Sequence, residues 1–296
     1  MEPFSRSGRK IRRAAAVLAF AAFAIAQAAA PIAVTLIPHY MAGSTLYYAV
    51  AIHSDLGGKA TMDTAAEIAL RILPGSPAGG FDTEMHFTKF ATTVHASGQV
   101  LAGLQKQAAT TDHAALTMTP ARFQVALGKF QVLARQAGPD YDQPVEMLEE
   151  LVRTDALPTG ATAVGSQWTR HRTRDLPTMN ASVALTLQCQ LTAVAPVAGQ
   201  PAATITVHSL GNTALPPNAL PGSQAMAAQG LVPEATVAFD TAATSVYRVA
   251  DAVLLQTTSQ TSNQMHIKLV GPNPQAGSQE SDINSTASVK LEKIVN

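Results

Sequence analysis

Apolar and polar residues alternate along much of the chain, most regularly between residues 182 and 192. There Val183, Leu185, Leu187, Cys189 and Leu191 are separated by small or polar residues. A period of two places these five side chains on one face of a strand, which predicts an antiparallel sheet with one face on the core and the other in water. Further strands are predicted in this half at residues 204–208, 236–239, 245–249, 253–258, 265–270 and 288–294.

The first half has the same character, with strands predicted at residues 46–52, 67–73 and 85–94. Phe123-Gln-Val125 recurs as Phe130-Gln-Val132 on the other side of Gly128. The spacing of the phenylalanines also suits a helix, but the repeat around a glycine favours a β-hairpin.

One helix is predicted, over residues 143–153, with Asp142 as its cap and Pro158 just beyond its end. Residues 211–230 and 271–282 are rich in glycine, proline and polar residues and are expected to be irregular loops. The predicted fold is therefore mainly β (β-rich α+β), with two similar antiparallel curved-sheet halves and one short connecting helix. The expected divisions are a leader at 1–28, an N-terminal half at 29–138, a helix-containing connector at 139–164 and a C-terminal half at 165–296.

The N-terminus has the organisation of a secretory signal peptide. Five basic residues precede the charge-free apolar run Ala14–Ala26, and Ala26-Gln27-Ala28 offers small residues at the spacing of a cleavage site. The run is shorter than the ~20 residues that a membrane-spanning helix needs. We expect cleavage before Ala29, a periplasmic or extracellular location, and no stable transmembrane anchor afterwards. The export route, by Sec or by the twin-arginine system, stays open.

Charged residues make up only 14% of the chain, against about 25% in typical proteins. Without residues 1–28 the chain keeps 15 basic and 19 acidic residues, so no nucleic-acid partner is expected. Cys189 is the only cysteine, which excludes an intramolecular disulfide. Because it falls on the apolar face of its strand, we predict a buried, unreactive thiol.

The sequence carries none of the common catalytic signatures. It has no Gly-x-Ser-x-Gly elbow, P-loop, dinucleotide glycine motif or His-Glu-x-x-His. No catalytic residue, metal ligand or cofactor is predicted. Glu146, Glu149 and Glu150 could supply paired carboxylates for glycoside hydrolysis, but a solvated helix face is the favoured interpretation.

The stretch from Leu157 to Arg174 stands out because it carries the only tryptophan, Trp168, and three alternating arginines. On a strand, Arg170, Arg172 and Arg174 point the same way as Trp168. They form either an anion-recognition stripe or a charged outer face on an edge strand, and the second is favoured. The candidate ligand-binding residues are Trp168, Arg170 and Arg172. Trp168 itself is expected to pack in the core rather than to line a binding concavity.

The sequence Leu157-Pro158, followed by Val164-Gly165-x-x-Trp168, resembles a segment of secreted or periplasmic bacterial families of unknown function. The resemblance implies that this segment opens the second of two β-rich halves, and that a strand like the one containing Phe239-Asp240 precedes the last hairpins. The acidic residue usual between the glycine and the tryptophan is replaced by Ser166 or Gln167. No activity is attached to such families, so the resemblance implies architecture and location only.

These observations favour an exported, non-enzymatic protein that uses its sheet surfaces to bind a lipid-like ligand or an envelope partner. One alternative is a structural envelope or adhesion component, and another is a hydrolase whose residues converge only in the folded chain. A deep apolar pocket would favour the binding protein, a polar cleft with converging catalytic groups the hydrolase, and flat polar sheets the structural component.

Overall fold

A computed structural model describes residues 32–74, 80–176, 179–220, 223–271 and 277–296. These residues form one compact unit that begins at Ile32. The expected signal peptide and its cleavage site lie outside the described residues.

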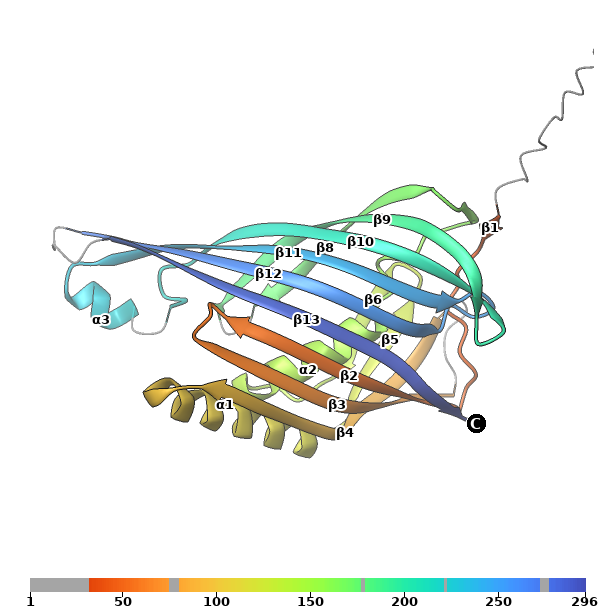
Figure 1. The fold of residues 1–296 in the computed structure, drawn as a ribbon, viewed down its shortest axis with the longest axis horizontal. Coiled ribbons are helices and arrows are strands. Elements are labelled where there is room, and N and C mark those ends of the chain that lie inside the picture. Colours follow the sequence, from red (N-terminus) through yellow and green to blue (C-terminus); the bar gives the residue numbers. More distant parts are fainter. Residues whose placement is uncertain (1–31, 75–79, 177–178, 221–222, 272–276) are drawn as a thin grey trace, which may run out of the picture. The chain divides into compact units, whose positions relative to one another are not determined.

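Eleven strands form one antiparallel sheet in the order β6-β5-β4-β3-β2-β13-β12-β11-β10-β9-β8 (Figure 1). Its strands are β2 (Thr45–Leu56), β3 (Ala60–Ile72), β4 (Gly80–Ala96), β5 (Ala121–Ala126), β6 (Lys129–Ala134), β8 (Gln167–Leu176), β9 (Ala181–Val197), β10 (Gln200–Leu215), β11 (Val232–Arg248), β12 (Leu254–Val270) and β13 (Gly277–Val295). Two short strands, β1 (Ala33–Val34) and β7 (Thr162–Ala163), pair with each other in a second sheet.

The mainly β fold class is confirmed, since 62% of the described residues are in strands and 16% in helices. The two predicted groups of strands are adjacent parts of the same sheet. They meet where the first long strand pairs with the last, with Val50 of β2 opposite Val289 of β13. The β5–β6 hairpin around Gly128 is also confirmed, and Gly128 has the positive φ of 66° that favours glycine in such a turn.

Several strands are longer than the sequence indicates. The expected loop at 211–230 is partly wrong, because β10 continues to Leu215, which pairs with Ala235 of β11. The expected loop at 271–282 is also partly wrong, because β13 begins at Gly277, opposite Leu269. In both places the neighbouring strand satisfies the backbone hydrogen bonds, so pairing outweighs the poor strand propensity of the local residues.

The predicted helix is confirmed as α2 (Pro139–Val152), which begins one turn earlier than expected, with Pro139 in its first turn. Two helices were not predicted, α1 (Gly98–Thr117) and α3 (Ser223–Ala228). The buried residues of α1 include Ala108, Ala114 and Ala115, and alanine gives only a weak apolar signal in a sequence. Within the described residues no helix is both long and apolar enough to cross a bilayer.

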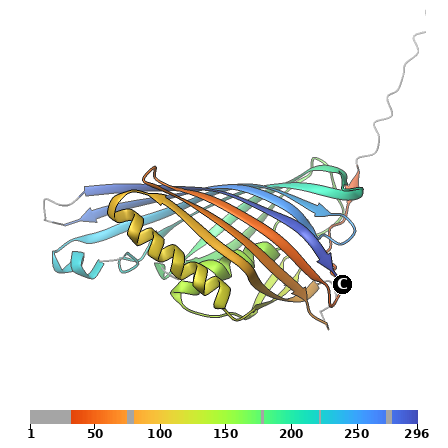
Figure 2. The ribbon, with the colours of Figure 1, turned by 60° about the horizontal axis from the view of Figure 1, so that its bottom comes forward.

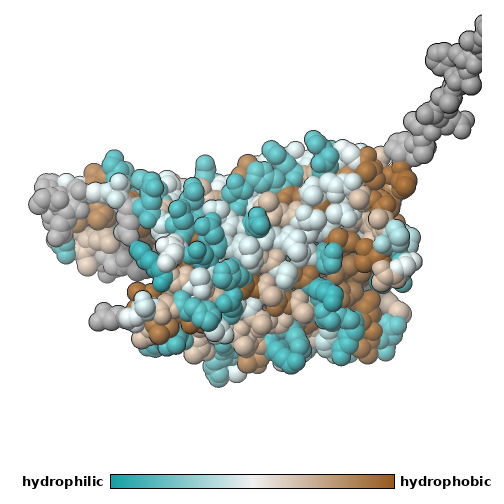
Figure 3. All heavy atoms as spheres, in the orientation of Figure 1, coloured by the Kyte–Doolittle hydropathy of each residue, from teal (hydrophilic) through white to brown (hydrophobic). Residues whose placement is uncertain are grey.

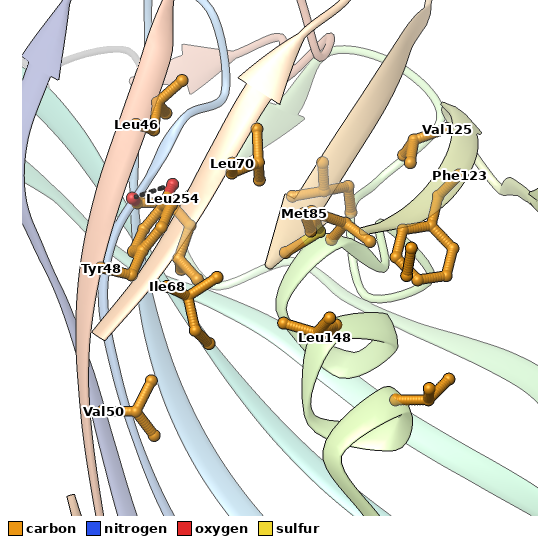
Figure 4. Packing of buried hydrophobic residues seen from close by; sticks show 14 of the residues in the cluster. Leu46, Tyr48, Val50, Ile68, Leu70, Met85, Phe123, Val125, Leu148 and Leu254 are labelled. Carbon is orange, nitrogen blue, oxygen red and sulfur yellow. Dashed lines mark hydrogen bonds between the residues drawn. The ribbon is translucent and has the colours of Figure 1, made fainter. Parts of the chain in front are cut away.

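The core lies on one face of the sheet and is closed by α2 (Figure 4). Leu46, Tyr48 and Val50 of β2 face Leu148 of α2 across side chains from β3, β4 and β5. The Tyr48 hydroxyl donates a hydrogen bond to the Leu254 carbonyl at 3.1 Å, so this buried polar group is satisfied. Helix α1 lies along β4 and next to α2 (Figure 2).

Candidate functional site

One register row crosses nine strands of the sheet. Trp168 of β8 lies opposite Cys189, and the pairing continues strand by strand to Thr92 of β4. The row has the same orientation as the core residues of β2, because Ile52 follows Val50 by two positions. We call it the core-side row. Its members are Trp168, Cys189, Val207, Ala243, Ser259, Ala287, Ile52, Thr64 and Thr92.

Two further rows flank the core-side row, and their side chains point to the opposite face of the sheet because side chains alternate along a strand. The first consists of Thr169, Gln188, His208, Ala242, Gln260, Thr286, His53, Asp63 and Thr93. The second consists of Gln167, Gln190, Thr206, Thr244, Thr258, Ser288, Ala51, Ala65 and Ala91. Most of these eighteen residues are exposed, and the others are half-buried.

A hollow of about 1360 Å³ is bordered by eight of the nine core-side residues, all but Thr92, and by all eighteen residues of the flanking rows. One hollow can border strands from β8 round to β4 only on the concave face of the sheet. That face carries the core and the helices, because Arg172 of β8 pairs with α2, and α1 packs on both β4 and α2 (Figure 2). The core-side side chains therefore point into the hollow, which we call the inner cavity.

The side chains that point into the inner cavity are mostly apolar or small, and none is charged. They are Trp168, Cys189, Val207, Ala243, Ser259, Ala287, Ile52 and Thr64. The Thr64 hydroxyl already bonds to that of Thr92 at 3.2 Å. The inner cavity therefore offers an apolar surface with few polar groups.

Trp168 lies in the core-side row, so its side chain borders the inner cavity. The indole is half-buried against the core, and its Nε1 donates a hydrogen bond to the Ala156 carbonyl at 3.2 Å. Cys189, opposite Trp168, is buried as predicted, and burial raises the pKa of its thiol to about 11. A thiol held neutral in this way is a poor nucleophile.

The three arginines of β8 point to the same side as Trp168 and meet α2 and the segment that follows it. Arg172 Nη1 lies 3.0 Å from the Glu150 carboxylate and 3.7 Å from that of Asp155. Arg174 forms an ion pair with Glu146, and Arg170 donates to the Leu157 carbonyl at 3.4 Å. β8 is an edge strand, as expected, but the prediction of a charged outer face is wrong, because α2 supplies carboxylates to this face.

The prediction of a solvated glutamate face on α2 is only partly right, because the Glu150 and Glu146 side chains are 43% and 38% exposed but Glu149 is mostly buried. Only 13% of the Glu149 side chain is exposed, and it pairs with Arg135 at 3.2 Å and with Arg153 at 3.6 Å. Burial raises the pKa of Glu149 above its ordinary value, although both arginines oppose the shift. Burial likewise raises the pKa of Glu146, opposed by Arg174. These groups border a crevice of about 570 Å³ between α1, α2 and β8.

Trp168, Arg170 and Arg172 thus share one side of β8, but each is bonded to a different partner, and of the three only Trp168 borders the inner cavity. The described residues show no serine, histidine and carboxylate hydrogen-bonded in series. They also contain no group of three or more histidine, cysteine or acidic residues that could hold a metal ion.

The inner cavity itself was not predicted as a site, although Trp168 was named as a candidate ligand-binding residue. Its side chains belong to the apolar side of the alternating pattern, and alternation predicts a core face without showing that the core leaves space there. The signal that was available is the small size of three neighbouring core-side residues, Ala243, Ser259 and Ala287.

No protein-family model matches the sequence, and no curated protein matches it. Among solved structures, the chain is similar to lipovitellin, in a structure of lipid–protein interactions, with a TM-score of 0.45 and 11% identity over 87% of this chain. The chain spans about a quarter of that protein, since the match covers 26% of it. It is also similar to an outer membrane channel from Pseudomonas putida F1, with a TM-score of 0.22 and 8% identity, covering 86% of this chain and 98% of that one. Both likenesses are too weak to indicate a function.

Proposed function

We propose that this chain is an exported, non-enzymatic binding protein, and that its inner cavity holds a lipid-like ligand. The observation that carries the proposal is the inner cavity itself, a hollow of about 1360 Å³ into which eight uncharged side chains point.

The size of the cavity supports a ligand with long alkyl chains. Ligand pockets in proteins are usually about 300–1,000 Å³ and lined mainly by apolar side chains. The inner cavity is larger than that. Ile52, Val207 and Trp168 supply apolar surface, and the small side chains of Ala243 and Ala287 leave room between them.

The lining supports an apolar ligand over a polar one. A glycan in the cavity would lose water from its hydroxyl groups, and the hydroxyls of Ser259 and Thr64 are too few to replace those hydrogen bonds. An alkyl chain has no such groups, and its burial is favourable. Because none of these side chains is charged, binding of this kind depends little on salt.

The exported location rests on the basic, apolar and small-residue order of residues 1–28. Intact-mass measurement of protein recovered from outside the cytoplasm is expected to show a chain that begins at Ala29. Recovery of the exported protein with Met1 to Ala28 still attached would contradict this part of the proposal.

Binding is tested with fatty acids of increasing chain length, titrated into the full chain and followed by calorimetry. Affinity is expected to rise with chain length until the cavity is filled. Ala243→Phe and Ala287→Phe, which place a bulky ring inside the cavity, are expected to weaken binding at least tenfold. Ala242→Phe, at an exposed position of β11 whose side chain points to the opposite face, is the matched control and should bind normally.

Two outcomes would overturn the proposal. Absence of binding at every chain length would favour a structural envelope component. Saturable binding of neutral oligosaccharides that Ala243→Phe and Ala287→Phe abolish would show that the cavity holds a polar ligand instead.

A further inference from the structure

One end of the sheet gathers exposed apolar side chains from separate parts of the chain. Because the strands are antiparallel, the start of β2, the end of β13 and the β9–β10 turn all lie at this end. The segment before β2 joins them, since Ile32 accepts a hydrogen bond from Val164 at 3.2 Å and His39 donates to the Asp251 carbonyl at 3.0 Å. Its exposed apolar side chains include Ile32, Ile37, Met41, Val164, Val197 and Val295. We call these six residues the apolar rim.

The apolar rim is pronounced for a protein with so polar a sheet face. Met41 is 59% exposed and Ile32 60%, values at which burial of the side chain would be favourable. Figure 3 shows hydrophobic residues gathered at the end of the molecule where Figure 1 places β1 and the C-terminus. Large apolar groups that converge from distant segments mark an interaction surface more often than single scattered ones do.

The rim carries almost no charge. Residues 32–45 and 193–203 contain no lysine, arginine, aspartate or glutamate. Of the charged groups at this end of the sheet, Arg248 and Asp251 pair at 2.7 Å, the Lys293 ammonium lies over the Tyr47 ring, 4.5 Å from its centre, and Arg71 lies opposite Thr45. The rim therefore matches an electrically neutral apolar partner rather than an acidic or basic one.

The sequence before the rim points to the identity of that partner. The apolar run Ala14–Ala26 ends six residues before Ile32. Six residues span at most about 20 Å, so before any cleavage a bilayer that receives this run is within that distance of the rim. We infer that the apolar rim docks on a lipid bilayer and inserts its side chains among the lipids.

Contact with lipid is tested in the full chain with an environment-sensitive fluorophore attached to one cysteine. Met41→Cys and Val197→Cys place the label on the rim. Val232→Cys and Val270→Cys are the matched controls, because these two residues are similarly exposed and pair with each other at the opposite end of the sheet. The natural Cys189 is buried, so the unsubstituted chain is expected to take up no label, which mass spectrometry checks.

With vesicles of phosphatidylcholine, labels at 41 and 197 are expected to shift to shorter wavelength and to become protected from an aqueous quencher. Labels at 232 and 270 should not change. Adding Ile37→Glu to a rim-labelled chain is expected to reduce partitioning about tenfold, because burial of one such side chain is worth about that factor. The shift should persist in 0.5 M salt.

The fluorescence reports on the surroundings of the labelled residue. Vesicle binding through residues 1–31 alone would therefore not produce the same shift. No shift at the rim, or equal shifts at both ends, would overturn the inference. A shift that needs anionic lipid and disappears in salt would also overturn it, because it would show electrostatic attraction in place of apolar insertion.

Discussion

Arg172 of β8 and Glu150 of α2, 22 residues apart in the chain, form an ion pair with 3.0 Å between guanidinium and carboxylate. The same guanidinium reaches Asp155, and only 17% of the Arg172 side chain is exposed. The strand that ends the sheet is thus joined to the helix that closes the core.

Arg172→Ala is expected to lower the free energy of unfolding by about 1–3 kcal/mol, because it removes one of the two arginines that pair with Glu150 and Asp155 in a partly buried place and leaves only Arg153. Urea titration followed by circular dichroism measures the change. Lys89→Ala is the matched control, since its pair with Glu67 is 72% and 47% exposed and such pairs contribute about 0–1 kcal/mol. Equal effects of the two substitutions would contradict a structural role for the β8–α2 pairing.

Trp168→Ala is expected to destabilise the chain by about 3 kcal/mol, because the indole packs against the core and bonds to Ala156. Trp168→Phe keeps most of the packing and loses only the hydrogen bond, so it should cost about 1 kcal/mol. Since the indole also borders the inner cavity, its emission should change saturably during titration with fatty acids. Constant emission in a titration for which calorimetry shows binding would mean that the ligand is held elsewhere.

The strands were predictable from the sequence because their signal is local. The alternation from Val183 to Leu191 predicts a strand with one face on the core and the other in water. The burial of Cys189 follows from its place in this alternation. The continuity of the sheet was not predictable, because the pairing of β2 with β13 joins residues more than two hundred positions apart. The prediction for the arginines of β8 failed for a related reason, since alternation shows that they share a face of the strand but not that α2 covers that face.

Gly211 illustrates the limit at a single residue. In the sequence it opens a stretch rich in glycine and proline, which indicates a loop. In the structure it lies within β10, opposite Phe239, where the backbone of β9 approaches too closely for any side chain. The glycine is therefore required by tertiary packing, and nothing in its local sequence distinguishes that requirement from a turn.

The stability of the α2 region is expected to depend on pH through Glu149. Burial raises its pKa above the ordinary value of 4.5. At a pH between the pKa of the unfolded chain and that of the folded chain, the folded chain therefore binds more protons. The contribution of Glu149 to stability therefore falls as the pH rises through this window and is constant above it. Glu149→Gln does not titrate and should lack this component.

The measurement is the difference in unfolding free energy between the unsubstituted chain and Glu149→Gln, taken from urea titrations between pH 4 and pH 8. As the pH rises, the unsubstituted chain is expected to lose unfolding free energy relative to Glu149→Gln. Glu67→Gln, on the exposed pair with Lys89, corrects for the general effect of removing one negative charge. If the unsubstituted chain instead gained unfolding free energy relative to Glu149→Gln as the pH rises, the arginine pairing would outweigh burial at Glu149.

Gly211→Ala and Gly103→Ala are expected to change stability in opposite directions. A Cβ at Gly211 would lie 2.7 Å from the Ala184 carbonyl oxygen and 2.6 Å from a Leu185 methyl group, and backbone in a paired strand cannot move aside. The expected cost is about 1–3 kcal/mol. Gly103 lies in α1 with nothing within 4 Å of an added Cβ, and alanine is favoured over glycine in a helix, so that substitution should stabilise by about 1 kcal/mol. Thermal and urea unfolding of both variants test the pair. A neutral Gly211→Ala would show that β9 and β10 do not approach as closely as described, and a destabilising Gly103→Ala would show that residues 98–117 are not helical there.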